Sequence, residues 1–294
     1  MELVYGICLK YLGDEGKAED AVKSWLTELQ NTFDKHIRGR EAWRKEKDIL
    51  PRLMKQTHRY YAAKKAGMDE EAIFDLFNQE VPMRIFSWDG PLDTVMTPMD
   101  SLKYYKSFLQ AGMMSMEPQT GHVKAWVGGI NYKHFQYDMV KQGKRQIGST
   151  FKPFVYATAI NQLQMSPCLE LSNTTWTIPK GKYGLDKDWA PKNADGKYGG
   201  FKTLKDALAT STNVITAQLI DKTTPQNVVK LAKNLGIESE ILEVPSIALG
   251  TVDLSLFEMT GAYNTFPNRG MYVKPMMVLR IEDKNGTILY EFKP

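Results

Sequence analysis

Ser149 and Lys152 stand three residues apart, in a segment bounded by Gly148 and a proline. Residues at this spacing share one face of a helix, so a hydroxyl and an amine would lie side by side. A hydroxyl needs a nearby base to become a nucleophile. Phe151 and Phe154 flank the lysine, and removal of an amine from water favours its neutral, basic form. The pair therefore predicts a serine nucleophile with a lysine base.

A second polar element, Ser211-Thr212-Asn213, follows later in the chain with apolar residues on both sides. A hydroxyl and an amide in such a setting need hydrogen-bond partners, and a substrate amide or the Ser149–Lys152 pair could supply them. Each element alone is a weak signal. An isolated serine–lysine pair is commonly a helix start with a solvated lysine, and a serine in a turn is commonly a cap.

The spacing of apolar residues predicts the elements that must position these groups. A largely buried helix is expected over 147–163, with Ser149 near its N-terminus, where free N–H groups favour developing negative charge. Residues 204–220 are expected to form one helix that carries Ser211 and Asn213. Residues 176–200 are rich in Gly, Pro, Asn and Lys, which is typical of a long loop.

The rest of the chain divides into a helical part and a mixed part. Helical periodicity runs from residue 1 to about 80, and Gly67 is a plausible stop within it. Thr97 and Pro98 are suited to begin a helix. The remaining elements predicted are a strand over 83–88, helices over 98–111, 224–235 and 255–266, and hairpins over 112–128 and 276–292.

Composition excludes several classes of protein. The 294 residues are 43% hydrophobic and 24% charged, which is ordinary for a folded protein with a core. A formal net charge of +4 suggests no nucleic-acid partner. Two cysteines and four histidines stand in no ligand spacing, so no metal or other cofactor is expected. No apolar run of membrane-spanning length and no signal peptide is found.

Taken in this order, the two polar elements resemble those of the transpeptidase domain of penicillin-binding proteins, whose motifs include SxxK, a Ser-x-Asn element and KTG. From about residue 16 to 294 the chain is most similar to a bifunctional (class A) penicillin-binding protein of the 1A type. The resemblance is carried by 112–129, 145–148, 189–193, 199–200, 247–263, 270–275 and 280–283.

The resemblance implies a fold and a division of the chain. The fold would be α/β (α+β), an antiparallel sheet flanked by helices, as in penicillin-binding transpeptidases and serine β-lactamases, with Ser149 beginning the central helix. Residues 1–84 would be a helical linker region, and residues 85–294 a partial transpeptidase domain. Residues 1–15 do not resemble the family, and no role is assigned to them.

The resemblance also implies an activity and residue roles. The activity would be D,D-transpeptidation, an acyl transfer that cross-links peptidoglycan stem peptides and is captured by β-lactam antibiotics, without a cofactor. Ser149 would be the acylated nucleophile, and Lys152 its base. Ser211 would relay a proton to the leaving group. Asn213 would bind the substrate's peptide amide, and the N–H of Ser149 would form half of an oxyanion hole.

The sequence departs from the family at both ends. No Lys-Thr-Gly or Lys-Ser-Gly occurs, and Lys284-Asn285-Gly286 lies in a predicted turn. We expect a chain that stops before this third motif, acylates weakly or not at all, and exposes unpaired sheet edges. A membrane anchor and a glycosyltransferase domain, expected in the parent protein at the outer face of the cytoplasmic membrane, are absent from this sequence.

Two other functions remain open at this stage. A serine β-lactamase would need a base that activates water for deacylation, and residue 212 is Thr where an SDN motif has Asp. A non-catalytic penicillin-binding or sensor module would keep the pocket without turnover. Stable labelling by a penicillin without turnover would favour the sensor module.

Overall fold

The computed structural model describes residues 49–291, so the helices expected before residue 49 lie outside the described residues. These residues form two compact units, one of 49–111 with 129–136 and one of 112–128 with 137–291. The predicted domain boundary between residues 84 and 85 falls within the first strand.

The smaller unit consists of four short helices and a hairpin. Thr57, Asp69 and Thr97 cap three of the helices, each through a side-chain oxygen that accepts a backbone N–H. Ile73, Phe77 and other apolar side chains pack in its core. The elements are α2 (Ile49–Lys55), α3 (His58–Lys65), α4 (Glu70–Phe77), β1 (Val81–Ile85), β2 (Leu92–Met96) and α5 (Pro98–Ser107).

The larger unit holds every residue that the sequence places in the candidate site. It combines helices with short antiparallel strand pairs, β3–β4, β5–β8, β6–β7 and β9–β10. Its strands are β3 (Met113–Met116), β4 (Val123–Val127), β5 (Lys144–Gln146), β6 (Glu170–Ser172), β7 (Phe201–Thr203), β8 (Asp253–Ser255), β9 (Arg280–Glu282) and β10 (Ile288–Glu291). Its helices are η2 (Gly148–Phe151), α6 (Lys152–Leu163), η3 (Lys182–Gly184), α7 (Leu204–Ala209), α8 (Asn213–Thr223), α9 (Pro225–Asn234), η4 (Pro245–Leu249) and α10 (Leu256–Tyr263).

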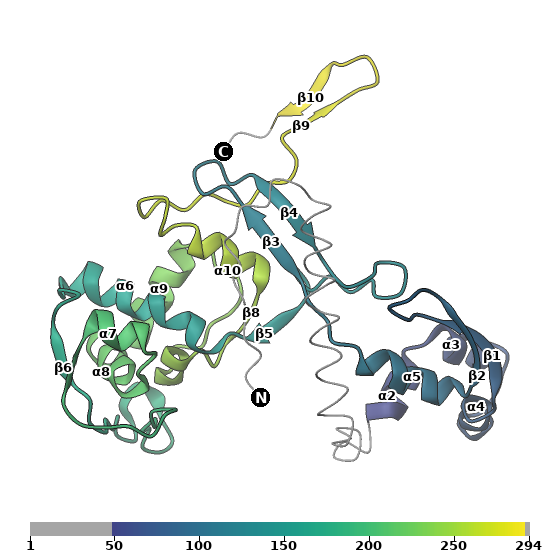
Figure 1. Ribbon diagram of the computed structural model, residues 1–294, viewed down its shortest axis with the longest axis horizontal. Helices are drawn as coiled ribbons and strands as arrows, with labels where there is room; N and C mark the ends of the chain where they lie inside the picture. Colours follow the sequence, from purple (N-terminus) through teal and green to yellow (C-terminus); the bar gives the residue numbers. More distant parts are fainter. Residues whose placement is uncertain (1–48, 292–294) are drawn as a thin grey trace. The chain divides into compact units, whose positions relative to one another are not determined.

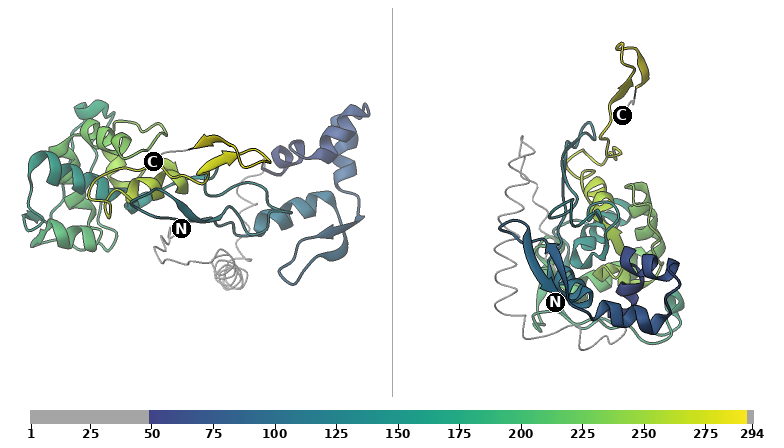
Figure 2. Two further views of the ribbon diagram at one scale, coloured as in Figure 1. Left: turned by 90° about the horizontal axis from the view of Figure 1, so that it is seen from above. Right: turned by 90° about the vertical axis from the view of Figure 1, so that its right-hand side faces the viewer.

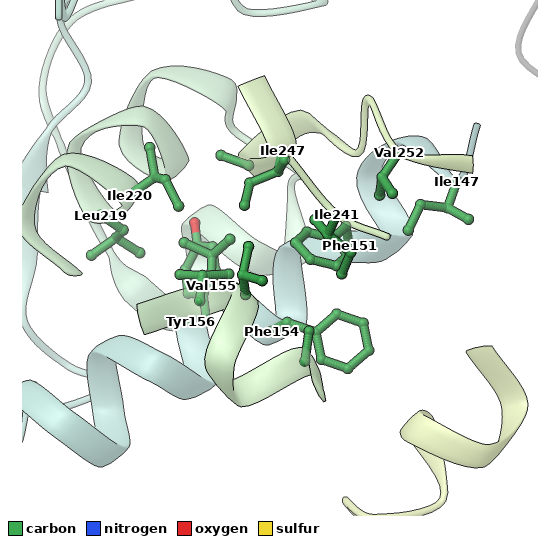
Figure 3. Close-up of a cluster of buried hydrophobic side chains, with 14 of the residues drawn as sticks. Ile147, Phe151, Phe154, Val155, Tyr156, Leu219, Ile220, Ile241, Ile247 and Val252 are labelled. Atoms are coloured by element: carbon green, nitrogen blue, oxygen red, sulfur yellow. The ribbon is translucent and has the colours of Figure 1, made fainter. Parts of the chain in front are cut away.

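Helices α6, α8 and α9 pack together with α7 beside them, and this group is the teal-to-green part of Figures 1 and 2. Their core is fully apolar at its centre, where Phe151, Val155 and Leu219 have no exposed surface. Figure 3 shows Val155 and Tyr156 next to Leu219 and Ile220. Because burial of one large apolar side chain contributes about 1.5–3 kcal/mol, this cluster holds η2 and α8 in fixed positions.

The two predicted hairpins and one predicted helix stop are confirmed in the larger unit. The hairpins form at 113–127 and at 280–291, within the predicted ranges. Gly236, with a φ of 90°, lies just beyond the end of α9, as expected of a helix stop. No helix among residues 49–291 is both long and apolar enough to cross a membrane.

The N-terminus of α10 is built around a buried carboxylate. Glu258 and Ser255 form a reciprocal capping box. Glu258 also accepts hydrogen bonds from the backbone N–H of Ser239 at 2.6 Å and of Glu238 at 3.1 Å. Burial alone would raise the pKa of Glu258, but the hydrogen bonds from Ser255 and Ser239 outweigh burial and hold this pKa below its ordinary value.

Because of this carboxylate, the free energy of unfolding should decrease as the pH becomes acidic. A depressed pKa in the folded state contributes stability that is present above the ordinary value of 4.5 and lost as pH falls through the folded value. Glu258→Gln should therefore lower the free energy of unfolding at pH 7 by about 1–3 kcal/mol and flatten its decline below pH 4.5. Urea titrations at several pH values test this, with the exposed Glu243→Gln as the control. An equal slope of unfolding free energy against pH in the unsubstituted protein and both variants would contradict this prediction.

Candidate active site

Ser149 lies at the surface, on a short helix whose next residues are anchored in the hydrophobic core. It is the second residue of η2, which continues directly into α6. Its side chain is exposed, whereas Phe151, two residues on, has no exposed surface. The predicted position of Ser149 near a helix N-terminus is thus confirmed. The arrangement presents a hydroxyl to an incoming molecule while the core holds the backbone beneath it.

The backbone entering η2 is held by a close approach of two chain segments. The N–H of Ile147 donates to the carbonyl of Val252 at 3.1 Å, and that of Gly148 donates to the carbonyl of Gly250 at 3.0 Å. Gly250 has a φ of 75°, and a Cβ on it would lie 1.8 Å from the Gly148 carbonyl oxygen. Only glycine allows this contact, which sets the position of the residue before Ser149.

Tyr263 holds the other side of the same turn. Its hydroxyl donates to the carbonyl of Thr150, one residue after Ser149. Burial raises the pKa of Tyr263 to about 12, so the phenol keeps its proton and remains a donor. The sequence indicates no role for Tyr263 beyond its place in the similar segment 247–263, because a tyrosine in a helix gives no signal of a partner more than 100 residues away.

Lys152 is buried and its amine is directed at the Ser-Thr-Asn element. Only 1% of the residue is exposed. Its Nζ donates to the carbonyl oxygen of Ser211 at 2.7 Å, to Ser211 Oγ at 2.9 Å and to Asn213 Oδ1 at 2.6 Å. Three oxygen acceptors, two from Ser211 and one from Asn213, thus surround this amine. The two motifs that are separate in the sequence therefore meet at one atom.

The predicted single helix over 204–220 is wrong, and the break falls at the motif. Helix α7 ends at Ala209 and α8 begins at Asn213. Ser211 lies between them with a φ of 51°, in the left-handed region that non-glycine residues rarely adopt. The strain turns the Ser211 carbonyl and hydroxyl toward Lys152, and strain of this kind commonly persists at functional sites. Helical periodicity continues across the turn, so it could not reveal the break.

Asn213 is fixed by a second asparagine. Its Nδ2 donates to the carbonyl of Lys192 at 2.8 Å, which leaves Oδ1 facing Lys152. Asn193 Oδ1 accepts the first two N–H groups of α8, those of Asn213 at 3.0 Å and Val214 at 3.1 Å. Asn193 is itself buried, and its Nδ2 donates to Asn173 Oδ1 at 2.9 Å. The predicted loop over 176–200, which is irregular apart from the short η3, thus supplies the cap of the helix that carries Asn213.

Removal of this cap should loosen the site. Asn193→Ala leaves the first N–H groups of α8 and the Asn173 amide oxygen without these partners, and each buried unpaired group costs about 1–3 kcal/mol. We expect the free energy of unfolding to fall by at least about 1 kcal/mol. Denaturant unfolding checks this against Asn161→Ala, an exposed position on α6 that should change stability by less than about 0.5 kcal/mol. Equal stability of the two variants would contradict it.

No group of three or more His, Cys, Asp or Glu side chains between residues 49 and 291 is placed to hold a metal ion. Cys168 is a free, exposed thiol, and Cys8 lies outside the described residues.

Comparison with known proteins identifies the class to which this fold and site belong. Residues 111–294 match the family model of the penicillin binding protein transpeptidase domain, and residues 29–109 match that of the penicillin-binding protein middle domain. Because the transpeptidase match covers more than half of the chain, the chain belongs to the penicillin-binding protein transpeptidase family. The resemblance proposed from the motifs is thereby confirmed.

The particular relatives are named penicillin-binding protein 1A. The protein of Aquifex aeolicus is 35% identical over 188 residues, which cover 63% of this chain and 25% of the relative. That of Neisseria lactamica is 28% identical over 291 residues, which cover 96% of this chain and 35% of the relative. The chain thus spans about a quarter to a third of the length of these relatives.

Solved structures agree with this family. Penicillin-binding protein 1A of Haemophilus influenzae superposes with a TM-score of 0.57 at 27% identity, over 62% of this chain and 27% of that one. PonA1 of Mycobacterium tuberculosis, solved in complex with penicillin V, superposes with a TM-score of 0.54 at 21% identity, over 81% and 64% of the two chains. At that identity the second match shows the fold alone. The predicted α/β penicillin-binding transpeptidase fold is confirmed.

Proposed function

We propose that this chain carries the acyl-transfer site of a peptidoglycan D,D-transpeptidase, with Ser149 as the residue that becomes acylated. The observation that supports this most strongly is the contact of Lys152 Nζ with Ser211 Oγ and Asn213 Oδ1 at 2.9 and 2.6 Å. One buried amine, three residues after Ser149, thereby contacts a second hydroxyl and a side-chain amide. This is the set of groups that acyl transfer through a serine requires.

In the first half of the reaction, Ser149 Oγ attacks the carbonyl carbon of the D-Ala–D-Ala peptide bond of a stem peptide. The neutral amine of Lys152 takes the hydroxyl proton, and it keeps two donated hydrogen bonds to the Ser211 carbonyl and to Asn213 while its lone pair is used. Ser211 passes its proton to the departing nitrogen and regains one from Lys152, whose Nζ lies 2.9 Å from Ser211 Oγ. The C–N bond breaks, the terminal D-alanine leaves, and an ester on Ser149 remains.

In the second half, the amine of an acceptor stem attacks the ester carbonyl. The new C–N bond forms, the ester C–O bond breaks, and the proton that the acceptor nitrogen loses returns to Ser149 through Lys152. The negative charge on the carbonyl oxygen would be stabilised by the Ser149 N–H at the start of η2. Asn213 would bind the substrate's backbone amide through the same side chain that contacts Lys152.

The proposed partners and location follow from this activity. The substrates would be peptidoglycan stem peptides, and β-lactam antibiotics would acylate Ser149 in their place, as expected of a penicillin-binding family. The parent protein would act in the cell envelope, at the outer face of the cytoplasmic membrane. A nucleic-acid partner and a metal cofactor are not part of the proposal.

A fluorescent penicillin tests the nucleophile. The chain should take up at most one label per molecule, and the label should survive denaturing electrophoresis because it is an ester. Ser149→Ala should abolish labelling, whereas Ser166→Ala, which alters an exposed serine beyond the end of α6, should leave it unchanged. Labelling that persists in Ser149→Ala would contradict the assignment.

The rate of labelling and the fate of the label separate the related functions. We expect slow labelling, because none of the 294 residues forms the Lys-Thr-Gly motif that binds the substrate carboxylate in the family. Release of hydrolysed penicillin over many turnovers would indicate a serine β-lactamase. A stable label with no transfer to an acceptor amine would indicate a penicillin-binding sensor.

A further inference from the structure

A second lysine reaches the Ser-Thr-Asn turn on which Lys152 acts. Lys202 Nζ, from strand β7, donates to Thr210 Oγ1 and to Thr212 Oγ1, each at 3.0 Å. These threonines stand immediately before and after Ser211. Neither the family motifs nor the mechanism above assigns any role to Lys202.

The hydroxyls in this cluster can be assigned as donors and acceptors. Thr210 Oγ1 donates to the Asp206 carbonyl at 2.7 Å, so its lone pairs accept from Lys202 and from Thr212. The two threonine oxygens are 3.0 Å apart, which fits donation from Thr212 to Thr210. Each hydroxyl therefore donates once and accepts from Lys202. The ammonium ion links both sides of the turn into one network.

Because of this network, the side chain of Thr212 does not cap the helix that it precedes. Thr212 is the N-cap of α8, a position from which threonine normally accepts an N–H of its own helix. No such bond forms, and Asn193 caps the helix instead. Thr212 is only 5% exposed, so without Lys202 its hydroxyl would lose an accepted hydrogen bond at a site with little access to water.

The direction of Lys202 is set by the strand pair. Leu171 and Lys202 are Cα partners in the β6–β7 ladder, so their side chains lie on the same face. Leu171 packs against the hydrophobic core of the unit. Lys202 thus extends from an interior-facing position toward the turn, while its neighbour Phe201 remains 70% exposed.

We propose that Lys202 is a positioning residue that holds Thr210 and Thr212 together and thereby keeps Ser211 in its left-handed conformation. Ser211 has a φ of 51° and must remain so for its carbonyl and hydroxyl to face Lys152 together. Lys152, on α6, bonds Ser211 itself, and Lys202 bonds the threonines on either side of Ser211. The consequence for acyl transfer rests on the proposed function, whereas the effect on the turn does not.

Amide hydrogen exchange tests the effect on the turn without any substrate. The N–H of Ser211 donates to Leu208 at 3.0 Å and that of Thr212 to Ala207 at 2.8 Å, so both report opening of the turn. Lys202→Met should raise their exchange rates by at least about tenfold, because hydrogen bonds from a charged group contribute more than those between neutral groups. Lys202→Arg, which keeps charge and donors, should restore protection. Lys205→Met, an exposed lysine on α7, is the matched control.

Penicillin labelling of the same variants tests the consequence for the reaction. Lys202→Met should be labelled about tenfold more slowly than the unsubstituted chain. This decrease in labelling rate should match the increase in amide exchange rate, and Lys202→Arg should recover both. Unchanged exchange in Lys202→Met would overturn the proposal, and faster exchange with an unchanged labelling rate would overturn its consequence for the reaction. If the unchanged chain takes no label, the proposed function fails, and exchange still decides whether Lys202 holds the turn.

Discussion

Replacement of Lys152 by methionine should lower the rate of penicillin labelling at Ser149 by about 10²–10⁴-fold, the range in which a general base contributes. Methionine has a similar length and no basic nitrogen, so it removes proton transfer with little change in volume. The amine that contacts Ser211 and Asn213 would be lost, while the exposed hydroxyl of Ser149 would remain in place.

The same change should affect stability less than activity. It leaves the Ser211 carbonyl, Ser211 Oγ and Asn213 Oδ1 without the donor that all three share, and an unpaired buried group costs about 1–3 kcal/mol. The apolar surroundings of residue 152, which is 1% exposed, favour the methionine side chain and offset part of this cost. We therefore expect a folded protein with modestly reduced stability and almost no labelling.

Labelling kinetics and urea unfolding of Lys152→Met and Lys205→Met separate the two effects. Lys205 is exposed on α7 and contributes nothing to the site, so its variant should match the unchanged chain in both measurements. Rapid labelling of folded Lys152→Met would contradict the role of Lys152 as base. If that variant is unfolded, the urea curve will show it, so that unfolding can be told apart from loss of reactivity at Ser149.

Gly250→Ala should be among the most destabilising single substitutions in the chain. The added Cβ would lie 1.8 Å from the Gly148 carbonyl oxygen and 2.5 Å from its nitrogen. Both are backbone atoms, so no side-chain rotation relieves the clash. The free energy of unfolding should fall by about 2–5 kcal/mol, since overpacking costs about 1–3 kcal/mol and a left-handed alanine about 1–2 kcal/mol more. The segment before Ser149 would shift, and labelling would slow with it.

Gly196→Ala is the matched control for this substitution. Gly196 also has a left-handed φ, 67°, but a Cβ there would meet nothing within 4 Å. Its variant should lose only about 1–2 kcal/mol, the cost of the conformation itself. The difference between the two variants in denaturant midpoint then measures the close approach of Gly250 and Gly148. Equal midpoints would show that the chain relaxes around the added methyl group.

Local signals in the sequence predicted the elements but not the contacts between them. Ser149 at a helix start, the cap at Thr97 and the stop at Gly236 follow from residue types within a few positions, because helix starts and stops are decided locally. The pairing of the Ser149 and Lys152 side chains, which rests on helical spacing, stays a prediction. These predictions needed no knowledge of the rest of the fold.

The parts of the site that sequence reasoning missed depend on distant partners or on strain. The break at Ser211 is stabilised by two lysines from other elements, whereas the apolar spacing of 204–220 continues without interruption. Asn193 caps a helix that begins 20 residues later, and Tyr263 binds Thr150 from a different helix. Tertiary contacts of this kind override local propensity, and they concentrate where the chemistry is placed.

The central claim is that Ser149 is the acylated nucleophile, and peptide mapping by mass spectrometry after incubation with benzylpenicillin tests it most directly. We expect one added penicilloyl group per chain, located on the peptide that contains Ser149 and absent from the peptide that contains Ser211. Lys152→Met should show almost none of this adduct at the same incubation time. An adduct on Ser211 or on any other residue, with the Ser149 peptide unmodified, would contradict the account.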